Sequence, residues 1–99
     1  MKADLILKRR QWVSETAFLD LVVWRVPAPV PGSQHDFKYR LALISHGVCV
    51  MRYDNEAGKG DHKHTFGGSE EPYVFTDPET LVKDFLADVE AWRTARWER

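Results

Sequence analysis

Hydrophobic and polar residues alternate along the first half of the chain, in runs that turn-forming residues separate. Alternation with a period of two is typical of strands that bury one face. The second run is apolar on both faces except for Asp20, so we expect that strand to lie inside the sheet. His46 and Gly47 alone separate the third and fourth runs, and a two-residue connection that ends in glycine predicts a β-hairpin. The predicted strands cover residues 5–12, 17–26, 37–45 and 48–53.

The last quarter of the chain predicts one helix. Apolar residues recur three or four positions apart between residues 81 and 92, which gives a single apolar stripe. Thr76 and Glu79 have the spacing of a capping box, with Pro78 in the first turn. A short strand is expected just before, at residues 73–75. Strands first and one helix last predict an α+β fold: an antiparallel sheet of four to five strands with one C-terminal helix packed on one face.

Length and composition narrow the class of protein. Ninety-nine residues, 43% of them hydrophobic, predict one globular domain over residues 1–99. No apolar run approaches the ~20 residues that cross a bilayer, and no secretory segment is recognisable, so a cytoplasmic protein without membrane contact is expected. The single cysteine, Cys49, excludes an intramolecular disulfide. Because Cys49 stands between two valines on a predicted strand, we expect it to be a buried small apolar residue.

Charge is divided unevenly along the chain. The net charge is -1, yet residues 1–52 carry eight Lys or Arg against four Asp or Glu, and residues 53–99 carry six against eleven. An evenly basic nucleic-acid-binding protein is therefore disfavoured. A local basic face remains open, because Lys38 and Arg40 could extend the run Lys8-Arg9-Arg10 towards an RNA backbone. The same run would also serve as a solvated edge that prevents strand aggregation.

Candidate chemistry gathers after the fourth predicted strand, in the polar stretch 54–69. His62 and His64 are two residues apart, so in an extended segment both rings project to one side and Lys63 projects to the other. One interpretation is acid–base catalysis on RNA, since imidazole titrates near neutral pH and a nearby cation stabilises phosphate charge. A second is a divalent metal held by both histidines and one of Asp54 or Asp61. A third is a polar loop whose side chains only satisfy turn geometry.

Four segments together resemble the TumE family of small bacterial toxin-like proteins: KADLILKRR, PxPxPGSxHxFKYRLAL, GVCVMRYDNEAGKGDHKH and the helical DVEAWR. The resemblance covers nearly the whole chain, and RYDNEAGKGDHKH is its most specific part. It implies a toxin of a type II toxin-antitoxin module, neutralised by a cognate helix-turn-helix antitoxin and acting on RNA. Members often carry a further histidine in the D-N-x-x-G segment, where Glu56 and Ala57 stand here. The family's hallmark positions fall on Tyr53, Asp54, Asn55, Gly58, His62 and His64.

These observations assign expected roles around the segment 54–64. The expected catalytic residues are His62, His64, Asp54 and Lys59. The expected substrate-binding residues are Arg52, Tyr53, Asn55 and Gly58. No cofactor is assigned, and a divalent metal at His62 and His64 is the alternative. The competing function is a non-enzymatic module that binds a helix-turn-helix partner through the sheet and the helix end, where Trp97 is expected to be exposed.

Overall fold

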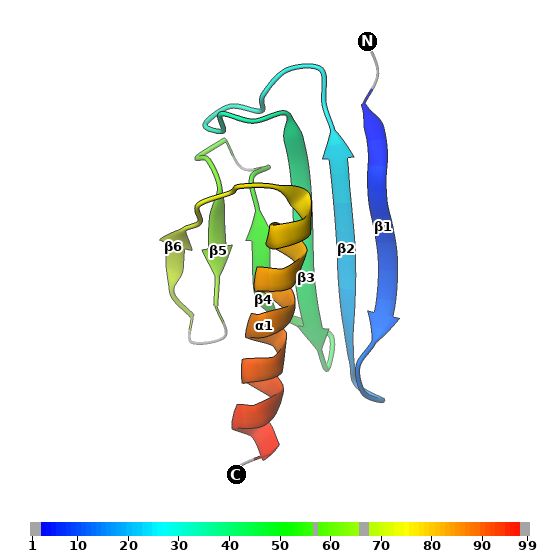
Figure 1. Cartoon of the computed structure of the whole chain (residues 1–99). Coiled ribbons are helices and arrows are strands. Elements are labelled where there is room, and N and C mark those ends of the chain that lie inside the picture. The colour runs from blue at the N-terminus through cyan, green and yellow to red at the C-terminus, as the bar shows by residue number, and fades with distance from the viewer. Residues whose placement is uncertain (1–2, 57, 66–67, 98–99) are drawn as a thin grey trace.

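The computed structural model describes residues 3–56, 58–65 and 68–97. Within them the chain forms one six-stranded sheet followed by one helix (Figure 1). Each strand pairs antiparallel with the next along the chain, so the order in the sheet is the order in the sequence. The α+β prediction is confirmed, with six strands in place of four to five. The elements are β1 (Asp4–Trp12), β2 (Ala17–Arg25), β3 (Phe37–Ser45), β4 (Val48–Asp54), β5 (His62–His64), β6 (Glu70–Pro72) and α1 (Pro78–Trp97).

The predicted hairpin joins β3 to β4. His46 and Gly47 have φ angles of 51° and 77°, so both central residues of the turn are left-handed. Such a turn follows the right-handed twist of the two strands that it connects. The hairpin therefore sets the position of β4, which carries Arg52 and Asp54 and pairs with the strand of the two histidines.

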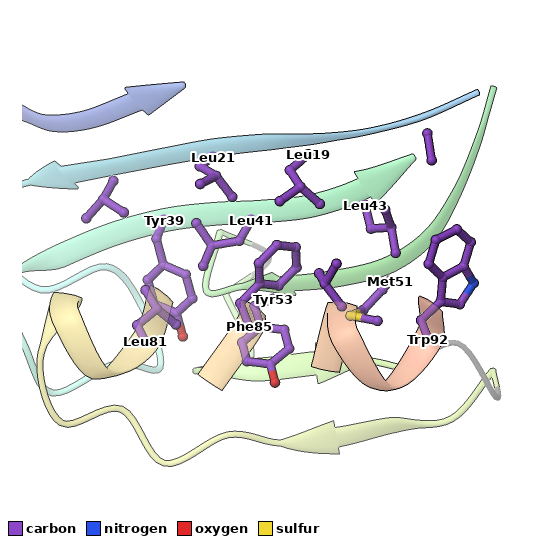
Figure 2. Packing of buried hydrophobic residues seen from close by; sticks show 13 residues of the cluster. Leu19, Leu21, Tyr39, Leu41, Leu43, Met51, Tyr53, Leu81, Phe85 and Trp92 are labelled. Carbon is purple, nitrogen blue, oxygen red and sulfur yellow. The ribbon is translucent and has the colours of Figure 1, made fainter. Parts of the chain in front are cut away.

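Alternate residues of β2, β3 and β4 form a core against α1 (Figure 2). The apolar stripe of α1 packs on this face through Leu81, Phe85, Val89 and Trp92, all buried. Leu86, at the edge of the stripe, stays 39% exposed. In Figure 2 the Tyr39, Tyr53 and Phe85 rings lie between the sheet and α1. Since α1 lies over only one face of the sheet, the face turned away from it, here called the open face, is covered by no described helix or strand (Figure 1).

Three sequence predictions are wrong. The helix is capped by Asp77, whose carboxylate accepts a hydrogen bond from the Thr80 backbone N–H at 2.7 Å, and not by Thr76. The strand predicted at residues 73–75 does not form: the last strand is β6, and residues 73–75 follow it without strand pairing. Cys49 is exposed because a register irregularity at Leu43 and Ile44 shifts the start of β4. The expected exposure of Trp97 concerns a side chain outside the described part of the structure.

None of the described residues forms a helix with both the length and the apolar character that membrane crossing requires.

Candidate active site on the open face

Two rows of side chains cross the open face from strand to strand. Because successive residues of a strand point to opposite faces, residues paired across neighbouring strands share a face. The first row consists of Lys8, Val22, Arg40, Asp54, His62 and Pro72. The second row consists of Arg10, Asp20, Ala42, Arg52, His64 and Glu70. Strand register thus brings a guanidinium, two imidazoles and two carboxylates together over β4, β5 and β6.

Asp54 is the centre of the first half of this cluster. Its Oδ1 lies 3.0 Å from His62 Nε2, and its Oδ2 lies 2.8 Å from Arg52 Nε. Both contacts have ion-pair distances without the alignment of hydrogen bonds. The other ring nitrogen of His62, Nδ1, lies 3.0 Å from the Gly60 carbonyl oxygen. Because a carbonyl oxygen only accepts, Nδ1 carries a proton and Nε2 is the atom that faces the carboxylate.

His64 is the more accessible imidazole. Its side chain is 33% exposed, against 6% for His62, and the two ring centroids lie 5.2 Å apart. Its Nε2 lies 3.1 Å from Arg52 Nη2 and 3.1 Å from Glu70 Oε2. One ring nitrogen cannot donate and accept at the same time. Protonated, it donates to the Glu70 carboxylate; bare, it accepts from the Arg52 guanidinium, so this atom has a partner in either protonation state.

Glu70 is a member of the site that sequence reasoning missed. Besides its contact with His64, it pairs with Lys59 Nζ at 3.0 Å and 3.2 Å. The hydrogen bond from Lys59, the largest cause, lowers the pKa of Glu70, so the carboxylate stays ionised at neutral pH. Lys59, expected in a catalytic role, reaches His64 only through Glu70. Gly58 is exposed in the same connection and has a φ of 81°.

Tyr53 and Asn55 are not part of this cluster. Tyr53 points to the α1 side, where its hydroxyl donates a hydrogen bond to the Asp88 carboxylate. Burial, followed by the hydrogen bond to Asp88, raises the pKa of Tyr53, so the phenol stays protonated. Asn55 is 0% exposed, and its side chain bonds the backbone of Tyr39 and Phe37 and the hydroxyl of Ser33. Both residues therefore hold the fold around the site.

A metal fits part of the cluster. His62, His64 and Glu70 each offer one ligand atom, and these atoms lie within 4.8 Å of one another. Two imidazoles and one carboxylate are a donor set that catalytic zinc accepts. Asp61, weighed as a ligand from the sequence, lies elsewhere: its carboxylate accepts the Ser33 hydroxyl hydrogen bond and lies 2.7 Å from His35 Nε2. Arg52 and Lys59 stand beside the three ligands, and their positive charges oppose a cation there.

Fold and cluster together define a small α+β protein with a cluster of two imidazoles, two carboxylates and a guanidinium on the uncovered face of a meandering sheet. Residues 2–93 match the family model described as Toxin TumE, and the chain belongs to this toxin family. No curated protein and no solved structure matches the chain. The family resemblance expected from the sequence is thereby confirmed.

Proposed function

We propose that this toxin cleaves RNA by general acid–base catalysis on the open face. The observation that supports the proposal is the convergence of His62 and His64, with ring centroids 5.2 Å apart, on the carboxylate of Asp54 and the guanidinium of Arg52. An accessible imidazole beside a fixed cation supplies what phosphodiester transfer needs: a group that takes up a proton and returns it, and a charge that stabilises the phosphorane.

His64, the accessible imidazole, carries the proton in this reaction, and buried His62 helps to hold Asp54 in place. Neutral His64 accepts the proton of a ribose 2′-hydroxyl at Nε2, and the freed 2′-oxygen forms a bond to phosphorus. The bond from phosphorus to the 5′-oxygen breaks, and the proton that His64 Nε2 has gained passes to that oxygen. Asp54 positions His62 through its contact with Nε2, and Arg52 neutralises charge on the phosphate. The products are a 2′,3′-cyclic phosphate and a 5′-hydroxyl, and the proton count balances.

The test compares one substitution at two histidines. His64→Asn removes the accessible imidazole, and we expect RNA cleavage to fall by about 10²- to 10⁴-fold, the usual contribution of a general acid or base. His46→Asn is the matched control, because His46 lies exposed in the β3–β4 turn and asparagine tolerates its left-handed φ of 51°. Product ends are read by mass spectrometry. Unchanged cleavage by a folded His64→Asn protein contradicts the proposal.

The metal-binding arrangement favours a second candidate, hydrolysis by a metal held at His62, His64 and Glu70. Bound there, a divalent ion would activate water. Titration of the purified protein with Zn²⁺ in a calorimeter tests this candidate separately from activity. Binding that Glu70→Gln abolishes, together with cleavage that a chelator stops, supports it. Cleavage indifferent to chelator supports the acid–base reaction.

We also propose a cytoplasmic type II module in which a cognate helix-turn-helix antitoxin binds this toxin. Membership of a toxin family supports a neutralising partner. Co-expression of the chain with the product of the adjacent gene, followed by size-exclusion chromatography, tests the pairing and gives the stoichiometry. Co-elution of the pair, with no change to RNA by the free chain, favours the non-enzymatic binding module instead.

A further inference from the structure

A groove crosses the open face beside the candidate active site. Its volume is about 510 Å³, and it lies over β1, β2 and β3. The charged residues that line it are Lys8, Arg9, Arg10, Arg40, Asp20 and Glu56. Arg9 pairs with the core residue Leu21, so its side chain points to the other face; on the open face positive charges outnumber negative charges by three to two, although the whole chain has a net charge of -1. The groove is thus a local concentration of positive charge.

Two of these cations are free to bind an anion. Arg10 is committed to Asp20, with Nε–Oδ1 and Nη2–Oδ2 distances of 2.8 Å and 2.9 Å. The side chains of Lys8 and Arg40, by contrast, make no hydrogen bond or ion pair with any residue in the described ranges. A cation without a protein partner is available to a phosphate group.

Strand register connects these cations to the active site. Lys8 and Arg40 belong to the same cross-strand row as Asp54 and His62. With neighbouring strands ~4.8 Å apart, Arg40 is two strands or ~10 Å from His62, and Lys8 is four strands or ~19 Å away. An extended polyanion lying along this row would contact Lys8, then Arg40, and then the imidazoles.

An aromatic surface borders the groove. Trp12 is 58% exposed and its ring centroid lies 4.8 Å from that of Phe18. The Arg10 guanidinium lies 4.3 Å from the Phe18 ring centroid. Trp12 and Phe18 are paired two residues along the strands from Arg10 and Asp20, so they face the same side. An exposed indole beside backbone-binding cations is the arrangement that stacks an unpaired base.

We propose that the groove binds the backbone of single-stranded RNA, with Lys8 and Arg40 on phosphates and Trp12 stacked on a base, and delivers the strand to His64. The inference rests on the proposed function for its choice of nucleic acid. A duplex is disfavoured as the ligand, because its bases are already stacked on one another and cannot stack on Trp12.

Fluorescence anisotropy with a labelled, fully 2′-O-methylated 12-nucleotide RNA measures binding without cleavage. The double variant Lys8→Gln/Arg40→Gln is compared with Lys83→Gln/Arg93→Gln, which removes the same charge from the solvent side of α1. We expect the first variant to bind RNA more weakly. Its salt slope, d log K/d log[salt], should also be smaller in magnitude by about 1.4, because each lost phosphate contact on single-stranded RNA contributes about 0.7. We expect the second to bind as the parent protein does. Trp12→Ala is expected to weaken binding by about 5- to 150-fold.

The outcomes separate this proposal from the proposed function. Binding that depends on Lys8 and Arg40, without cleavage of unmodified RNA, keeps the groove assignment and removes the ribonuclease. Equal affinity of the two double variants overturns the assignment, as does equal affinity for a 12-base-pair duplex. If Lys8→Gln/Arg40→Gln no longer co-elutes with the antitoxin but binds RNA as before, the groove is a protein interface and the RNA assignment is overturned. Circular dichroism melts confirm that each variant is folded.

Discussion

Substitution of Asn55 tests whether this buried residue supports the fold around the site or contacts the substrate. Its side-chain Oδ1 accepts a hydrogen bond from the Tyr39 backbone N–H at 3.0 Å, and its Nδ2 donates to the Phe37 carbonyl at 2.8 Å. A third bond joins Nδ2 to the Ser33 hydroxyl at 3.1 Å. Asn55→Ala removes all three and leaves the two backbone groups at the start of β3 without these partners.

The expected loss of stability follows from those two backbone groups. A buried polar group left unsatisfied costs about 1–3 kcal/mol, so Asn55→Ala should lower the free energy of unfolding by about 2–6 kcal/mol. Since a domain of this size has only about 5–15 kcal/mol in total, the upper end approaches global unfolding. The lower end corresponds to a fall in Tm of at least about 8 °C.

Urea denaturation followed by circular dichroism measures the effect, with Glu56→Ala as the control. Glu56 is the next residue and is exposed, so its substitution should change stability by less than about 0.5 kcal/mol. RNA cleavage per folded molecule should be unchanged in Asn55→Ala, because Asn55 is 0% exposed and its side chain bonds Ser33, Phe37 and Tyr39, none of which belongs to the cluster. A variant with parental stability that no longer binds RNA would show that Asn55 contacts substrate, and would refute this reasoning.

Three further predictions concern residues that stabilise the fold around the site. Phe85→Ala empties the centre of the α1 contact, where the side chain is 0% exposed, and should lower the free energy of unfolding by about 3–5 kcal/mol in the same denaturation assay. Gly60→Ala should destabilise more than Gly58→Ala: both have positive φ, but a Cβ at Gly60 would lie 2.8 Å from a backbone carbonyl oxygen, whereas a Cβ at Gly58 meets nothing within 4 Å. Asp77→Ala should lower the Tm at neutral pH and have little effect in strong acid. The bond from the Thr80 backbone lowers the pKa of Asp77, so its stabilisation is present above the ordinary carboxyl pKa and is lost as pH falls through the lowered value. Equal melting curves for Asp77→Ala and the parent at neutral pH would contradict the cap assignment.

Local sequence signals predicted the elements that depend on local physics. The two-residue turn at His46 and Gly47 and the apolar stripe of α1 are both set by residues close in the chain, and both are confirmed. The two-residue spacing of His62 and His64 also placed the rings on one side, with Lys63 on the other, where it contacts Asp88 of α1.

Features that depend on strand pairing could not be predicted in this way. β5 and β6 have three residues each and no apolar alternation; they become strands because each pairs with the edge of its neighbour in the sheet. Glu70 reaches His64 only through the β5–β6 register, and no spacing in the sequence indicates that contact. Cys49 was misplaced for a related reason, since one register shift reverses which face a residue occupies.

Alternation over residues 51–54 of β4 makes its backbone the boundary between two chemically distinct surfaces. Met51 and Tyr53 belong to the apolar packing with α1, whereas Arg52 and Asp54 belong to the ionic contacts on the other side. Energetic effects of substitutions that share no contacts are nearly additive. Exchanging charges on the open face therefore leaves the hydrophobic interior intact, so the ionic surface can change while the scaffold stays the same.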